Sequence, residues 1–213
     1  MIHAYDKIYL DKACIALGRM LDFAVYDLNY DIGEFFDLFM ASGVARRFEQ
    51  GDATVLVGKS GVELVYEVEW SLGKQSQVRP KYAVNRSPEY WAGWALAYYQ
   101  WESSLRFSEI LRCVPIKEIV AMYSPYHEMD IRQFVDKMNE LYLLANSETN
   151  LKRLRRQAGL SQKGLAEDSG VPLRTIQQYE QRQKSINKAQ VMYAVKLAKA
   201  LGCEVEELLE KVE

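Results

Sequence analysis

Charge and aromatic content both change sharply at one point of this sequence, near residue 147. Residues 1–147 carry 15 Lys/Arg and 20 Asp/Glu, a net charge of −5, whereas residues 148–199 carry 11 and 4, a net charge of +7. Only two aromatic residues, Tyr179 and Tyr193, lie after residue 147. Such a joint change is typical of a domain boundary. We therefore expect two domains, 1–147 and 148–213, joined closely through a short polar run.

The spacing of apolar residues in the first domain predicts helices separated by capping residues. Asp31, Ser60 (in a capping box with Glu63) and Ser87 before Pro88 are expected helix starts. Strands are scarce, and residues 54–57 are the only plausible short one; residues 72–86 are expected to form a loop. The expected helices are residues 8–28, 31–40, 44–48, 61–68, 88–101, 116–123 and a last one that starts at 129 or 130 and ends at 144. The prediction is an all-α domain.

The second domain divides into five short helical segments. Ser161 is expected to cap the second segment, and Asn187 the fourth, whereas Gly159 and Gly202 end helices. The second and third segments are joined by a turn at Gly170, where glycine readily adopts a left-handed conformation. Two short helices with such a turn form a helix-turn-helix unit. The whole chain is therefore expected to be all-α.

The second domain contains an ordered set of residues: Arg155 to Gln162, Leu165-Ala166, Gly170-Val171, Thr175-Ile176, Tyr179-Glu180, Leu197 to Leu201, and Leu208. This ordered set resembles the XRE/Cro/phage-repressor family. The resemblance covers about 64 residues, less than a third of the chain. It implies a five-helix, lambda-repressor-like domain that binds double-stranded DNA, commonly as a homodimer.

The helix expected over residues 172–181 buries Ile176 and Tyr179, so its other face carries long polar side chains. By resemblance, this helix lies in the major groove. Glutamine pairs with adenine and arginine with guanine, while a leucine contacts a thymine methyl. The implied base-reading residues are Leu173, Arg174, Gln177 and Gln178. The candidate phosphate contacts are Gln162, Lys163, Arg182 and Lys184.

The resemblance also implies a structural pair between Glu180 and Arg155. Three residues or segments depart from the family pattern. Gly164 lies inside a helix, at a cost of about 1 kcal/mol relative to alanine. Arg182 replaces a frequent helix-ending glycine, so the loop after the reading helix is expected to differ. We interpret the acidic tail after residue 200 as a solvated face, with a helix start as the alternative.

Catalytic interpretations of the first domain find little support, and we expect no enzyme. The run Val57-Gly58-Lys59-Ser60 lacks the earlier glycine of a phosphate-binding loop, since residue 53 is alanine. His127-Glu128 has no companion nucleophile, and Cys113 reads as a buried thiol. The chain has three cysteines and two histidines, with no CxxC. We expect no metal site, no cofactor and no disulfide framework, as in a reducing cytosol.

The row Trp91, Trp94, Tyr98 and Trp101 follows one helix face, which we interpret as core, with a partner-binding surface left open. The first residues lack a signal-peptide pattern, and the charge-free stretch 90–101 is shorter than the ~20 residues of a membrane span. We expect a cytoplasmic DNA-binding regulator, in refined form the repressing antitoxin of a toxin–antitoxin locus, with residues 1–147 binding the toxin or another protein. The alternative is a small-molecule sensor, or a cryptic enzyme, with an aromatic pocket in the first domain.

Overall fold

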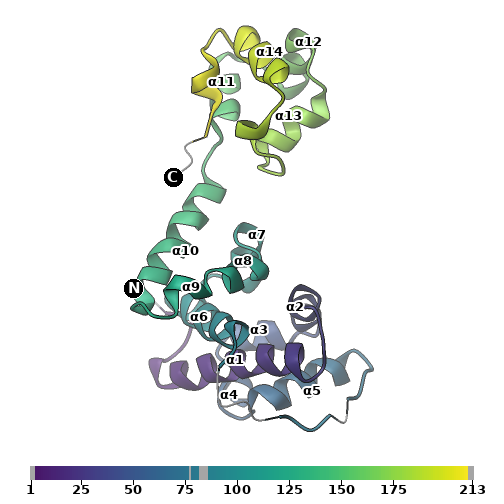
Figure 1. Ribbon diagram of the computed structural model, residues 1–213, viewed down its shortest axis with the longest axis vertical. Helices are drawn as coiled ribbons and strands as arrows, with labels where there is room; N and C mark the ends of the chain where they lie inside the picture. Colours follow the sequence, from purple (N-terminus) through teal and green to yellow (C-terminus); the bar gives the residue numbers. More distant parts are fainter. Residues whose placement is uncertain (1–2, 77, 82–85, 211–213) are drawn as a thin grey trace. The chain divides into compact units, whose positions relative to one another are not determined.

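The computed structural model describes residues 3–76, 78–81 and 86–210, and it is all-α, as expected (Figure 1). No strand occurs among these residues. The chain forms two compact units, Met1–Leu144 and Ala145–Glu213. The sequence-based boundary after residue 147 lies slightly beyond this division. Of the expected loop 72–86, residues 77 and 82–85 lie outside the described residues, and the remainder contains no helix.

The expected caps of the N-terminal unit are confirmed. Asp31 accepts hydrogen bonds from the backbone N–H groups of Gly33 and Glu34. Ser60 and Glu63 form the capping box, and Ser87 accepts from Tyr90 N. The helices of this unit are η1 (Lys7–Tyr9), α1 (Leu10–Tyr26), α2 (Ile32–Ala41), α3 (Val44–Glu49), α4 (Ala53–Leu56), α5 (Gly61–Ser71), α6 (Pro88–Ser103), α7 (Phe107–Cys113), α8 (Ile116–Ala121), α9 (Tyr123–Tyr126) and α10 (Ile131–Asn146).

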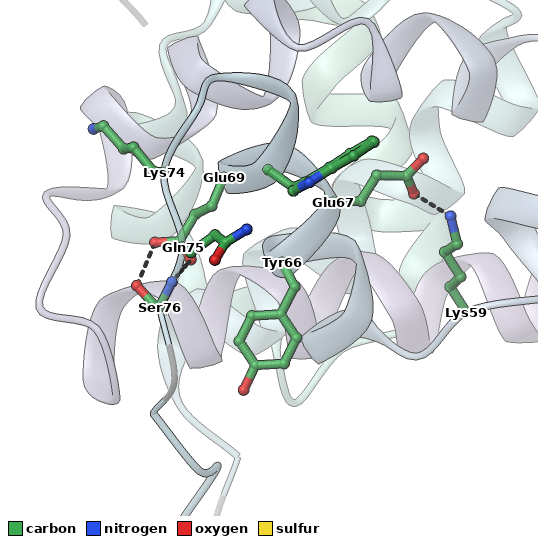
Figure 2. A pocket seen from close by; sticks show the side chains of 8 residues that line it. Lys59, Tyr66, Glu67, Glu69, Lys74, Gln75 and Ser76 are labelled. Carbon is green, nitrogen blue, oxygen red and sulfur yellow. Dashed lines mark hydrogen bonds and ion pairs between the residues drawn. The ribbon is translucent and has the colours of Figure 1, made fainter.

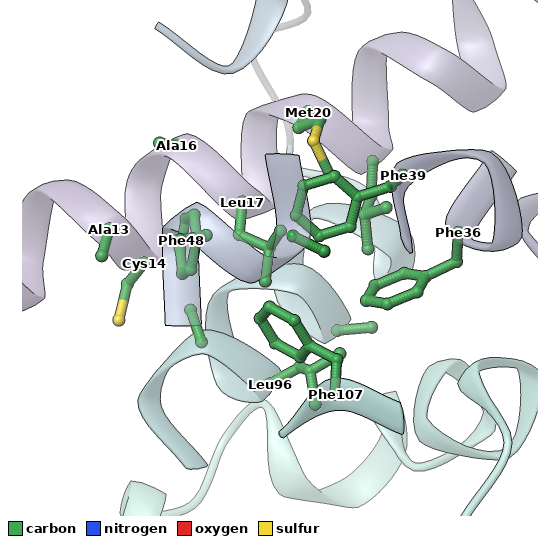
Figure 3. Close-up of a cluster of buried hydrophobic side chains, with 14 of the residues drawn as sticks. Ala13, Cys14, Ala16, Leu17, Met20, Phe36, Phe39, Phe48, Leu96 and Phe107 are labelled. Atoms are coloured by element: carbon green, nitrogen blue, oxygen red, sulfur yellow. The ribbon is translucent and has the colours of Figure 1, made fainter. Parts of the chain in front are cut away.

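Helix α1 lies at the centre of the N-terminal unit and packs against α5 and α6. Leu17 and Met20 are fully buried on this helix (Figure 3). The close approach of α6 requires a glycine, because a Cβ atom on Gly93 would lie 2.7 Å from the carbonyl oxygen of Leu17. Small residues at such a crossing let two helix backbones approach each other. The crossing of α1 and α6 therefore organises the core.

A cluster of phenylalanine rings fills the other side of this core (Figure 3). The ring of Phe107 lies 5.6 Å from that of Phe36, 5.9 Å from that of Phe39 and 5.8 Å from that of Phe48, measured between centroids. Offset and edge-on pairs at this separation stabilise a core beyond their buried area. Phe107 begins α7, a helix that the sequence analysis did not predict.

The one segment that was plausible as a strand, residues 54–57, is not a strand. Residues 53–56 form α4, which is capped by Asp52, whose side chain accepts from Thr54 N. Val55 and Leu56 are both fully buried. Two adjacent buried side chains do not fit the alternation of a half-buried strand. The cap and the burial in the core therefore outweigh the preference of the β-branched residues in this segment for a strand.

One expectation for the later helices needs correction. The helix expected over 116–123 ends at Ala121, and Pro125 lies inside the short α9, where Ser124 has non-helical dihedral angles. The aromatic row on α6 belongs to the core, as interpreted: Trp101 is buried in it, and Trp91, Trp94 and Tyr98 are half-buried and pack against it.

The C-terminal unit contains the five expected helices. They are α11 (Asn150–Gln157), α12 (Gln162–Ser169), α13 (Leu173–Glu180), α14 (Val191–Leu201) and α15 (Val205–Leu208), with a 3-10 turn, η2 (Ile186–Lys188). Each α-helix contributes to one core through Leu151, Leu165, Ile176, Leu197 and Leu208. This core is small, as expected for a unit of this length.

Candidate nucleic-acid interface

Helices α12 and α13 and the turn between them form the predicted helix-turn-helix unit. Ser161 caps α12 by accepting from Gly164 N, as expected. Gly170 ends α12 with φ +67°, the left-handed conformation expected of it. Val171 then enters the core, and Pro172 is the N-cap residue directly before α13. The turn is thus held by a cap, a glycine and a buried side chain.

Helix α13 separates buried from exposed side chains as predicted. Ile176 and Tyr179 are buried. Leu173 is 37 % exposed, Arg174 is exposed, and Gln177 and Gln178 are half-buried. Positions i, i+1, i+4 and i+5 share one side of a helix. The four residues predicted to read bases therefore lie together on the outer face of α13.

A buried carboxylate fixes α13 against the two preceding helices. Glu180 is 8 % exposed and accepts hydrogen bonds from Arg155 Nε at 2.6 Å and from Arg155 Nη2 at 2.9 Å. Arg155 also donates to the carbonyl oxygen of Leu160 at 2.7 Å. The hydrogen bonds to Glu180 raise the pKa of the Arg155 guanidinium. The structural pair implied by the resemblance is present, in the bidentate geometry that is strongest.

The two phosphate candidates at the start of α12 have different surroundings. Gln162 donates through Nε2 to Glu180 at 2.8 Å, so it belongs to the same network. An amide nitrogen carries two hydrogens, which leaves one for a phosphate oxygen. Lys163 is exposed, with its Nζ 3.7 Å from Glu167 Oε1. Both residues lie at a helix N-terminus, which favours an anion.

The two phosphate candidates after α13 also differ from each other. Arg182 adopts φ +56°, the left-handed conformation that favours glycine. Its guanidinium lies 3.1 Å from Glu210 Oε2 and donates to Ser147 Oγ at 3.0 Å. Lys184 is exposed, and its backbone N–H donates to the Gln178 carbonyl. The structure therefore engages Arg182 within the fold and leaves the Lys184 side chain on the surface.

The solvated face expected for the acidic tail is wrong at Glu210, a residue that the sequence analysis did not single out. Its carboxylate accepts from Asn150 N as well as from Arg182, and its backbone pairs with the Asn187 side chain. Asn187 therefore does not cap α14, which begins after Gln190 without a side-chain cap. Pairing of residues so distant in sequence has no local signal, so the sequence could not have revealed it.

The other candidate sites have structural partners. Figure 2 shows a surface cavity of about 430 Å³ with Lys59 and Glu67 at one end and Glu69 and Ser76 at the other. Lys59 Nζ lies 2.5 Å from Glu67 Oε2, and Ser60 caps α5. The residues that resemble a phosphate-binding loop thus form an ion pair and a helix cap.

The described part of the chain contains no group of three or more His, Cys, Asp or Glu side chains placed to hold a metal ion. Cys14 is buried, and its pKa is raised to about 12 by that burial. None of the three cysteines, all of which are described, forms a disulfide. No helix within the described residues is both long and apolar enough to cross a membrane.

Comparison with known proteins agrees with the geometry of the C-terminal unit. Residues 151–208 match the model of the helix-turn-helix family. The matched segment covers the five helices of this unit except for Asn150, the first residue of α11, and it confirms the resemblance inferred from the sequence. No curated protein and no solved structure matches the chain. The family match supports a DNA-binding transcriptional regulator.

Proposed function

We propose that this protein is a sequence-specific transcriptional regulator that represses its own operon. The observation that carries the proposal is the outer face of α13, where Leu173, Arg174, Gln177 and Gln178 lie side by side above a buried Arg155–Glu180 pair. Arginine and glutamine are the side chains that make bidentate contacts with guanine and adenine in the major groove. A rigidly held helix with this face suits base reading.

Backbone phosphates would be contacted from the two ends of the helix-turn-helix unit. Lys163 at the start of α12 and Lys184 after α13 are exposed. Gln162 adds one amide hydrogen beside Lys163. These contacts position the domain without reading sequence. The proposed interface does not include Arg182, because its guanidinium pairs with Glu210.

The test is binding of the full-length protein to DNA from its own promoter, compared with scrambled DNA of equal length at two salt concentrations. We expect tighter binding to the promoter than to scrambled DNA. Binding should weaken at higher salt, because each phosphate contact releases counterions from the DNA and this release is less favourable when the salt concentration is high. As a homodimer, the protein should protect two half-sites about 34 Å apart. Equal affinity for both DNAs at both salt concentrations would contradict the proposal.

The finer part of the proposal is that the N-terminal unit binds a partner protein, and that this partner is a toxin encoded beside the gene. Two features support it. Residues 1–147 carry a net charge of −5, which favours a basic partner. Large apolar side chains are exposed on this unit, among them Ile8, Tyr26 and Trp70. The proposal assigns no catalytic reaction to this chain.

Co-expression with the product of the adjacent gene tests this part separately. A stoichiometric complex that survives purification and persists without DNA is expected. A matched variant, Arg174→Ala, should weaken DNA binding and leave this complex intact. Failure of the two proteins to associate would remove the antitoxin assignment and leave the DNA-binding assignment standing.

A further inference from the structure

The N-terminal unit contains a cavity of about 490 Å³ with a mostly aromatic wall. Rings from α6, from α9 and from the residue after α9 line it: Tyr90, Trp91, Trp94, Tyr123, Tyr126 and His127. Sites for small organic molecules have volumes of about 300–1,000 Å³ and predominantly apolar linings. The size and lining of this cavity are therefore those of a small-molecule site.

Three of the cavity rings, those of Trp91, Tyr123 and His127, contact one another in a chain, and Trp91 also packs on Phe134 of the core. The Trp91 ring meets Tyr123 at 5.9 Å and Phe134 at 5.3 Å, both nearly perpendicular, and Tyr123 stacks on His127 at 3.9 Å between centroids. His127 Nδ1 also lies 2.8 Å from the carbonyl oxygen of Tyr123. Because these side chains already pack on one another without a ligand, binding would cost little free energy in arranging them.

The charges around the cavity select among aromatic ligands. Among its described lining residues none is acidic, and Arg86 is the one that is permanently charged. The Arg86 guanidinium lies 4.7 Å from the centre of the Tyr90 ring. Glu128, 3.5 Å from His127 Nε2, is largely exposed and does not line the cavity. A guanidinium attracts a carboxylate and repels a cation.

We propose that this cavity binds a small planar aromatic carboxylate, with its ring against Trp91 and Trp94 and its carboxylate toward Arg86. The proposal does not depend on DNA binding, since every residue involved belongs to the N-terminal unit. It gives that unit a ligand as well as a protein partner.

Three indole compounds that differ in charge test the proposal in calorimetric titrations of the full-length protein. Indole-3-acetate is anionic, indole is neutral and tryptamine is cationic, while the ring is the same. We expect indole-3-acetate to bind more tightly than indole, and indole more tightly than tryptamine, because only the anion gains the attraction of Arg86.

Two variants locate the binding. Trp94→Leu should weaken both indole-3-acetate and indole about fivefold or more, the loss expected for one stacking ring. Arg86→Gln should weaken indole-3-acetate about threefold and leave indole unchanged, as for one exposed charge pair. Trp70→Leu and Arg79→Gln are the matched controls, since both residues are exposed and lie outside this cavity. Neither control should change any affinity.

Several results would overturn the proposal. They are the absence of binding by all three compounds at millimolar concentration, tightest binding by tryptamine, or equal losses in Trp94→Leu and Trp70→Leu. Because Arg86 is exposed, Arg86→Gln keeps the test decisive even if Trp94→Leu does not fold. If no compound binds and Trp94→Leu abolishes association with the neighbouring gene product, the cavity belongs to the protein partner, and the small-ligand proposal fails.

Discussion

Both carboxylate oxygens of Glu180 are held by one guanidinium, that of Arg155, at 2.6 and 2.9 Å. The pair joins the first helix of the C-terminal unit, α11, to the end of α13. Arg155 is 25 residues before Glu180, and neither side chain reaches far into solvent. Since α13 carries the proposed base-reading face, this pair sets the position of that face within its own domain.

Removing the arginine should destabilise the C-terminal unit selectively. Arg155→Ala leaves the buried Glu180 carboxylate with Gln162 as its remaining side-chain donor. Losing one partner of a buried pair costs about 3–5 kcal/mol of folding free energy.

Urea unfolding of Arg155→Ala, followed by circular dichroism, should show this loss. Tryptophan fluorescence should show an unchanged transition, because Trp70, Trp91, Trp94 and Trp101 all lie in the N-terminal unit. Equal shifts in the two signals would contradict this assignment.

Shortening a base-reading residue should alter sequence preference. Gln178→Ala and Arg174→Ala should each weaken binding to the preferred site by about 1–3 kcal/mol and relax discrimination at one base pair. Affinities for the promoter and for singly substituted sites measure both effects. Gln183→Ala, at an exposed glutamine beyond α13, is the matched control. A uniform loss across all sites in Gln178→Ala would refute its base-reading role.

A phosphate contact should be visible in the dependence on salt. Lys163→Ala should weaken binding to every sequence similarly and make the plot of log affinity against log salt shallower by about 0.9. Lys12→Ala, at an exposed lysine of the N-terminal unit, should leave that slope unchanged. An unchanged slope in Lys163→Ala would place this lysine away from the DNA backbone.

The elements that sequence predicted well are those determined by neighbouring residues. Caps at Asp31, Ser60, Ser87 and Ser161 are confirmed because each side chain bonds to N–H groups two or three residues ahead. The Arg155–Glu180 pair was also expected, but through family resemblance. The base-reading and phosphate residues remain predictions. The structure places all of them at exposed or half-exposed positions, and it pairs the Arg182 guanidinium with Glu210.

The elements that sequence did not predict depend on distant contacts. Helix α7 is fixed by Phe107, which packs among rings from α2 and α3 more than 50 residues earlier. The segment 53–56 is helical because Asp52 caps it and the core buries Val55 and Leu56. Its β-branched residues alone would favour a strand. Glu210 joins Asn150, Arg182 and Asn187, a contact set that no periodicity predicts.

The cap of α4 should show a measurable acid titration. Asp52 accepts from Thr54 Oγ1 at 2.6 Å, from Arg47 Nε at 2.8 Å and from Thr54 N at 2.9 Å. These hydrogen bonds, from Thr54 first and then Arg47, lower the pKa of Asp52 from 3.8 to about 2. A lowered folded-state pKa stabilises the fold above the unfolded value, and the contribution disappears as pH falls from about 4 toward 2.

Carboxyl chemical shifts followed by NMR against pH measure this titration, and a midpoint near 2 is expected for Asp52. Thr54→Val should raise the midpoint, because it removes the hydroxyl that donates the first of these hydrogen bonds. Asp31, whose pKa is lowered chiefly by Lys117, should be unaffected by that change. A midpoint at the ordinary value for Asp52 would mean that the α4 cap is not formed in solution.

Arg182 offers the sharpest distinction between a structural and a DNA-contacting role. Its φ of +56° disfavours any residue with a Cβ, while its guanidinium bonds to Glu210 and Ser147. Arg182→Ala removes these bonds and keeps the backbone strain, whereas Arg182→Gly removes both. The glycine variant should therefore be more stable than the alanine variant by about 1 kcal/mol, as measured by urea unfolding. Both should retain the salt slope of DNA binding, since the guanidinium is engaged within the fold. A slope shallower by about 0.9 in both variants would instead assign Arg182 a phosphate contact.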